Sequence, residues 1–160
     1  RKGYLKIHVA VNIKTKEILA LEVTDEKVHD GKILKKLVNH VLDNQDKRKI
    51  ESVLADDGDY DSNTNFKYLQ EKKITPAIKV RRNSIVSPKN NRLRNNEVKL
   101  QAKDLLKWKT KRKYGQRWIS ETVFSAIKRM FGEYTSANRF QNMVKGIMIK
   151  VSLYNIFRRI

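Results

Sequence analysis

A tyrosine, an arginine, a glutamate and a lysine share one side of a helical wheel drawn through residues 114–128. At 3.6 residues per turn, Tyr114, Arg117, Glu121 and Lys128 fall within a sector of roughly 60°. Apolar residues occupy the opposite side, so a helix here can pack on a core and direct one carboxylate and three donors outward. A carboxylate can bind a hard cation, while the basic side chains can hold phosphate. The alternative is an ordinary solvated face.

A second group of carboxylates follows a short apolar run. Residues 52–58 read Ser-Val-Leu-Ala-Asp-Asp-Gly, which is typical of a central strand that ends in acids. Strand alternation places Asp57 on the same face as Val53 and Ala55, and Asp56 on the other face. Because register at a strand end is soft, both aspartates stay candidates on this ground.

A calcium-binding loop is excluded for the acidic run. Asp57, Asp59 and Asp61 have the one-three-five spacing of an EF-hand. The sixth position is Ser62, where that loop requires glycine, and the twelfth is Tyr68, where it requires glutamate.

The charge balance points to a polyanionic partner. The 160 residues include 36 basic and 17 acidic ones, for a formal charge of +19. A field of this sign attracts nucleic acid, and each contact with a phosphate releases counterion. Membrane surfaces and acidic proteins compete as partners, but no apolar run approaches the roughly 18 residues that span a bilayer, and no signal peptide pattern occurs. The absence of cysteine favours the reducing cytoplasm.

Periodicity predicts an α/β chain of one domain. Strands at 4–12 and 18–24 are expected to form a hairpin, and Asp30 is expected to cap a helix that ends near residue 44. A strand at 52–58, a helix at 65–73 and a strand at 76–80 follow. Helices are expected over 114–131 and 140–160, the second with its methionines and aromatics in the core.

The segment 79–113 differs in composition, with 13 basic residues, two acidic ones and little apolar periodicity. It separates the acidic run from Glu121. A flexible basic loop is one interpretation. The other is an insertion that clamps DNA and becomes ordered on contact with phosphate.

The spacing Tyr114-x2-Arg117-x3-Glu121-x6-Lys128 resembles the signature around the catalytic glutamate in one large group of bacterial and archaeal insertion-sequence transposases. These enzymes carry a DDE triad on a ribonuclease-H-like fold. The match continues through a Trp after the Arg, a Phe three residues past the Glu, and Lys-Arg-x-Phe-Gly-Glu at 128–133. Residues 57–62 resemble the family pattern Asp-Gly-x-Tyr-Asp-Ser, which favours Asp57 over Asp56 as the second acid.

The resemblance implies a ribonuclease-H-like mixed sheet flanked by helices and lacking its first strand, with the basic insertion before the Glu-bearing helix. It implies that Asp57 and Glu121 hold Mg²⁺ or Mn²⁺ for attack on phosphodiesters. Transposon ends and target DNA would be the partners, in a homodimeric complex without a small-molecule cofactor. The implied DNA contacts are Tyr114, Arg117, Lys128, Trp108, Arg112 and Lys113. Stacking of Trp108 on an extruded base competes with a role as a packing anchor.

The chain departs from the family pattern at the first acid. That aspartate is expected on a strand just before the hairpin, yet no Asp precedes Asp25 and the first residue is Arg1. We therefore expect a piece of a longer chain that does not cut DNA alone. A basic nucleic-acid-binding remnant of a decayed element and a ribonuclease-H-like nuclease are the alternatives.

Overall fold

Alternating apolar residues near the N-terminus form the expected antiparallel hairpin. In the computed structural model, which describes residues 5–44, 49–55 and 58–160, β1 (Leu5–Val11) pairs with β2 (Ile18–Asp25). The Asn12 side chain stabilises the turn by accepting two backbone N–H groups, at 2.9 and 3.2 Å. His8 is buried, and its Nε2 lies 2.9 Å from the Thr24 hydroxyl on the partner strand.

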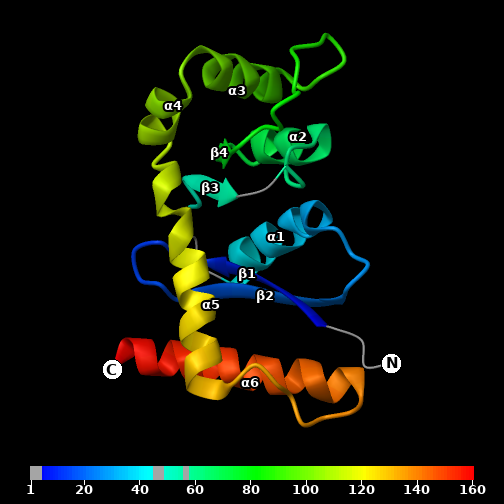
Figure 1. The fold of residues 1–160 in the computed structure, drawn as a ribbon, viewed down its shortest axis with the longest axis vertical. Coiled ribbons are helices and arrows are strands. Elements are labelled where there is room, and N and C mark those ends of the chain that lie inside the picture. The colour runs from blue at the N-terminus through cyan, green and yellow to red at the C-terminus, as the bar shows by residue number, and fades with distance from the viewer. Residues whose placement is uncertain (1–4, 45–48, 56–57) are drawn as a thin grey trace. The chain divides into compact units, whose positions relative to one another are not determined.

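The hairpin packs against the two C-terminal helices. These are α5 (Trp118–Phe131) and α6 (Phe140–Arg159), which both lie against the strands in Figure 1. Gly132 ends α5 with a φ of +72°, and its N–H donates to the Lys128 carbonyl at 2.8 Å. The core of this unit contains Ile18, Ile119, Val123, Ile147, Val151 and Tyr154.

The expected core face of α6 is only partly correct. Ile147, Val151 and Tyr154 are buried as predicted, but Phe140 is 47% exposed and Met148 is 53% exposed. A helix packed on one side of a two-stranded hairpin buries only a narrow stripe, which leaves these two side chains outside it.

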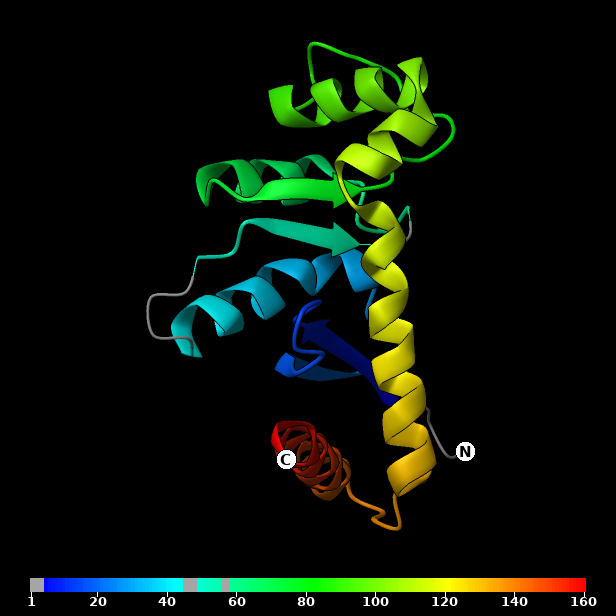
Figure 2. The ribbon, with the colours of Figure 1, turned by 90° about the vertical axis from the view of Figure 1, so that its left-hand side faces the viewer.

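A strand–helix–strand unit forms the centre of the second part of the chain. β3 (Ser52–Ala55) and β4 (Thr75–Ile78) are parallel and run side by side in Figure 2. They are joined by α2 (Asn63–Glu71), as the sequence predicts. The preceding α1 (Leu34–Asn44) contributes to the same core. That core contains Leu34, Val38, Ala55, Phe66, Tyr68, Leu69, Ile74 and Ile78.

The predicted N-cap at Asp30 is wrong. A 3-10 turn, η1 (Asp30–Lys32), precedes α1, and its N-cap is His29. Asp30 is therefore the first residue of the helical turn and not the residue that caps it.

The second half of the basic segment is folded, so the interpretation as a flexible loop is wrong for that half. Two helices occupy it, α3 (Arg92–Lys103) and α4 (Leu105–Lys111), followed by the 3-10 turn η2 (Tyr114–Arg117). Asn91 caps α3 and Asp104 caps α4 through side-chain oxygens that accept backbone N–H groups.

Contacts divide the chain into two compact units. One joins the N-terminal hairpin to Trp118–Ile160, and the other spans Val28–Arg117. Each contains one two-stranded sheet among the described residues. The architecture is therefore mixed α/β, and the single ribonuclease-H-like sheet stays a prediction. Within the described ranges, none of the helices has the length and apolar character needed to cross a membrane.

Candidate active-site elements

The loop that follows β3 carries the predicted acidic site. Asp57 and its alternative Asp56 lie outside the described residues, so the described part of the loop begins at Gly58. The loop ends at Ser62, whose hydroxyl accepts the N–H of Asn65 at 3.2 Å and caps α2.

Two residues from flanking elements hold the backbone of this loop. Gly31 in η1 approaches the Asp59 carbonyl so closely that a Cβ would overlap it. Asn65 in α2 is buried, and its Nδ2 donates to the Gly31 carbonyl at 3.0 Å and to the Tyr60 carbonyl at 3.1 Å. One amide group therefore links the loop to both η1 and α2.

Asp61 is the point at which the loop is joined to the basic segment. Its carboxylate is fully buried and accepts two hydrogen bonds from Arg94 in α3, Nε to Oδ1 at 2.7 Å and Nη2 to Oδ2 at 3.0 Å. The Ser84 hydroxyl donates at 2.8 Å and the Arg81 N–H at 3.0 Å. The Asp61 carboxylate therefore has a structural role, because it accepts hydrogen bonds from other residues of the protein.

Hydrogen bonding lowers the pKa of Asp61. Burial acts most strongly and raises this pKa, but the bonds from Arg94, Arg81 and Ser84 and the charge of Arg94 together outweigh burial. The charged form is thus favoured in the folded state relative to the unfolded one.

The free energy of unfolding should fall at acidic pH. Because the pKa of Asp61 is depressed on folding, its contribution is complete above the unfolded value near 4 and is lost as pH falls through the lower folded value. Urea unfolding below pH 4 should show a shallower pH slope for Asp61→Asn than for the wild type. Equal slopes would contradict this prediction.

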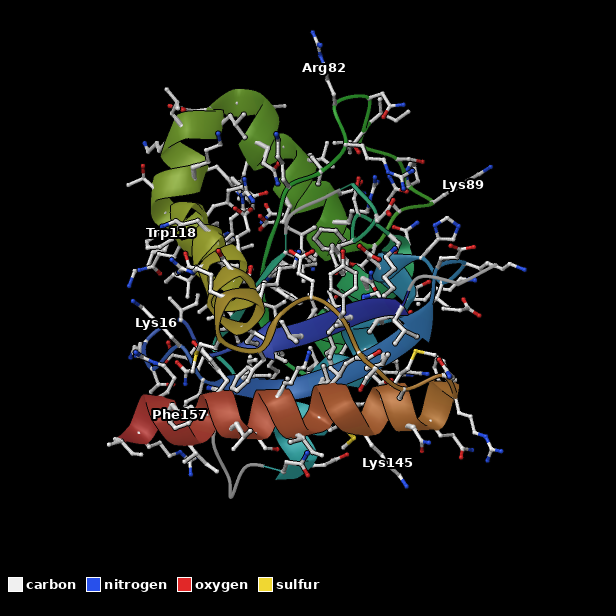
Figure 3. The ribbon with its side chains drawn as sticks, turned by 60° about the horizontal axis from the view of Figure 1, so that its bottom comes forward. Lys16, Arg82, Lys89, Trp118, Lys145 and Phe157 are labelled. Carbon is white, nitrogen blue, oxygen red and sulfur yellow. The ribbon has the colours of Figure 1, made fainter. Side chains whose placement is uncertain are left out.

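Arg81 makes a second contact with the acidic loop. Its Nε donates to the Gly58 carbonyl at 2.8 Å, and its guanidinium lies 3.9 Å from the Asp59 carboxylate. A Cβ on Gly58 would lie 2.9 Å from Arg81 Cγ, so glycine permits this approach. Figure 3 shows the neighbouring Arg82 and Lys89 projecting outward from the segment between β4 and α3.

Trp108 and Arg112 contact a buried carboxylate on α3. Trp108 is 3% exposed and its Nε1 donates to Glu97 Oε2 at 2.7 Å. Arg112 forms an ion pair with Glu97 Oε1. In this conformation both side chains bind the buried Glu97 and help pack α4 against α3. For Trp108 this is the packing role that was the alternative to stacking on a base. Lys113 is exposed, with a φ of 52° in the turn that leads out of α4.

Tyr114 and Arg117 do not belong to the helix that carries Glu121. They lie in η2, whereas α5 starts at Trp118. Tyr114 is 5% exposed, and its ring centroid lies 5.1 Å from that of Trp108. The expected continuous stripe of four polar side chains is therefore wrong at its N-terminal end.

Glu121 and Lys128 lie on one face of α5, as predicted. They are seven positions apart, which is about two helical turns, and both are exposed. Ile119 and Val123 are buried on the opposite face. Lys128 Nζ lies 3.2 Å from Glu133 Oε1, and both side chains are more than half exposed. This face can contact a ligand without disturbing the core.

The family of this chain follows from its match to a known domain. Residues 1–156 match the model of the transposase DDE domain. The chain belongs to this family. No solved structure matches it.

The DDE domain offers hard oxygen donors for a divalent cation. Glu121 is an exposed carboxylate, which suits Mg²⁺ or Mn²⁺. Within the described ranges, no group of three or more metal-ligating side chains gathers. The predicted partner Asp57 lies outside those ranges, so the pairing of the two acids stays a prediction.

Four polar residues with no functional signal in the sequence hold loops and helices of the DDE domain together: Asn65, Arg81, Arg94 and Glu97. They are polar and their roles depend on tertiary partners. The cap at Ser62 is predictable from the sequence, because a serine just before the start of a helix is a common N-cap signal.

Proposed function

We propose that this DDE domain is the catalytic part of a cut-and-paste insertion-sequence transposase. It acts on the ends of a DNA element and on target DNA, as a homodimer on a ribonuclease-H-like fold. The observation that carries the proposal is the exposed Glu121–Lys128 face of α5 within a chain that matches the family over residues 1–156. An acid and a base two turns apart on a solvent-facing helix suit a cation and a phosphate.

Asp57 and Glu121 are the proposed holders of Mg²⁺ or Mn²⁺. The bound cations would lower the pKa of attacking water and stabilise the leaving oxygen. Glu121 would contribute its carboxylate from the exposed face of α5, and Asp57 follows β3 in the sequence. Both residues leave room for phosphate oxygens, because two carboxylates fill only part of an octahedral shell.

Arg117, Lys128 and Lys113 are the proposed phosphate contacts, and Tyr114 is proposed to act with Arg117. Arg117 lies 6.0 Å from the Tyr114 ring centre, which favours a guanidinium held over the aromatic face. Arg112 and Trp108 are assigned to packing, since both are bound to the buried Glu97.

Iron-directed cleavage of the protein tests the paired acids. Fe²⁺ takes the place of Mg²⁺, and ascorbate with peroxide produces hydroxyl radicals that cut the backbone beside the bound ion. We expect cuts near residues 57 and 121, both reduced about 10-fold or more in Glu121→Gln, because losing a ligand should cost at least as much as losing an outer-shell partner.

The matched control is Glu71→Gln, which removes an equal charge from an exposed position at the end of α2. Its cuts should match those of the wild type. Cuts near residue 57 that persist in Glu121→Gln would show that the two acids do not share a cation and would overturn the proposed site.

The second candidate is a basic nucleic-acid-binding protein without catalysis. The charge of +19 and the outward Arg82 and Lys89 favour it. It predicts DNA binding that weakens with salt, is indifferent to Mg²⁺, and is accompanied by no localised iron cuts.

A further inference from the structure

Glu97 is a buried carboxylate that the proposed chemistry does not use. It is 0% exposed and lies in the middle of α3. Its two oxygens accept from two residues of α4, Trp108 through Nε1 and Arg112 through Nη2. These donors are four residues apart and so lie on the same face of the helix. The carboxylate therefore contacts α4 at two successive turns.

A contact at two turns fixes the rotation of α4 about its axis. The helix has only seven residues, which is too short to be stable without tertiary contacts. Leu105 and Leu106 of α4 are exposed, at 37% and 76%, so the apolar packing of this helix depends mainly on the buried Trp108. The polar contact with Glu97 is accordingly a principal constraint on the position of α4.

The position of α4 is passed on to η2 through aromatic packing. The Trp108 and Tyr114 rings are tilted by 49° with centroids 5.1 Å apart. The Arg117 guanidinium lies 6.0 Å from the Tyr114 ring centre. All of these residues belong to the unit Val28–Arg117. A continuous series of contacts thus runs from Glu97 through Trp108 and Tyr114 to Arg117.

We propose that Glu97 is a positioning residue for DNA binding, which orients Arg117 toward phosphate through Trp108 and Tyr114. This inference rests on the proposed role of Arg117. It makes the folded helices α3 and α4 a support for the phosphate-binding turn, in addition to any direct contact with DNA.

Whether Glu97→Gln strengthens or weakens DNA binding distinguishes a positioning role of Glu97 from an effect of its charge. Glu97→Gln removes a negative charge from a protein that is already at +19, so electrostatics alone predicts tighter binding to DNA. Positioning predicts the reverse, because the orientation of Arg117 is lost. Glu71→Gln makes the same charge change at an exposed site in the same unit and is the matched control.

The first measurement is the Trp108 indole N–H signal in ¹H–¹⁵N spectra, recorded in a Trp118→Phe background where Trp108 is the remaining tryptophan. We expect Glu97→Gln to shift this signal upfield, because a neutral amide is a weaker acceptor than a carboxylate. Glu71→Gln should leave it in place. An unchanged signal in Glu97→Gln would overturn the proposal at its first contact.

The second measurement is a double-mutant cycle in binding to a short blunt-ended DNA duplex, on the otherwise wild-type chain. We expect Glu97→Gln to weaken binding about 10-fold, as Arg117→Ala does, and the double variant to bind no more weakly than Arg117→Ala. Glu71→Gln should bind as well as or better than the wild type. Additive losses, or tighter binding by Glu97→Gln, would overturn the proposal.

Trp108→Phe keeps the inference testable if Glu97→Gln does not fold. It removes the Nε1–H donor, preserves an aromatic ring beside Tyr114 and leaves the net charge unchanged. A loss of affinity that disappears in the Arg117→Ala background supports positioning, and wild-type affinity contradicts it. If Arg117→Ala itself binds normally while the iron cuts persist, the positioning role fails and the proposed metal site stands.

Discussion

Asp61→Ala is expected to lower the free energy of unfolding of the unit Val28–Arg117 by about 3–5 kcal/mol. The Arg94 side chain is only 12% exposed and would lose its partner, so its charge would be left largely buried. The Ser84 hydroxyl and the Arg81 N–H would lose their acceptor as well. Urea unfolding followed by Trp108 fluorescence in a Trp118→Phe background measures the loss.

Asp59→Ala provides the control for Asp61→Ala. Asp59 is two residues away in the same loop, but its ion pair with Arg81 is long, at 3.9 Å, and both side chains are largely exposed. Exposed pairs of this kind contribute about 1 kcal/mol or less. If the two variants were equally stable, the buried network around Asp61 would not be the main link between the loop and α3.

Elements with strong local periodicity were predictable from the sequence. The hairpin, the strand–helix–strand unit and the stop at Gly132 all follow from alternation, helical spacing or a single glycine. In each of these elements, neighbouring residues carry the information, so no tertiary partner has to be known.

The helix α3 was missed for a physical reason. Its buried residues are Glu97, Val98 and Gln101, so two of its three core positions are polar. Because polar residues usually face solvent, the sequence gives no sign that this face of the helix is buried. Only the partners reveal it, namely Trp108 for Glu97 and, for Gln101, the Ile78 carbonyl at 2.9 Å.

The helical wheel through Tyr114–Lys128 failed where the backbone changes geometry. A wheel assumes one continuous α-helix, whereas the chain forms a 3-10 turn over Tyr114–Arg117. That turn sends Tyr114 against Trp108 instead of outward. Sequence spacing thus identified the family and the Glu121–Lys128 face, but it could not show that Tyr114 is a buried packing residue.

Gly31→Ala should disrupt the acidic loop through a single methyl group. The added Cβ would overlap the Asp59 carbonyl oxygen and lie 3.0 Å from the Asp59 carbonyl carbon. Both sides of this contact are backbone, so neither can move by changing a rotamer. The loop must shift, which also breaks the bonds from Asn65 to the Gly31 and Tyr60 carbonyls. We expect a loss of about 1–3 kcal/mol or more in the free energy of unfolding.

Gly115→Ala separates the clash from the general effect of adding a methyl group. A Cβ on Gly115 would meet nothing within 4 Å, and this glycine belongs to the same unit. Its variant should be as stable as the wild type or slightly more so, since alanine reduces the entropy of the unfolded chain. Gly31→Ala should also weaken the iron-directed cuts near residue 57, while Gly115→Ala should not. If Gly31→Ala leaves both stability and cuts unchanged, the close approach of η1 does not hold the acidic loop.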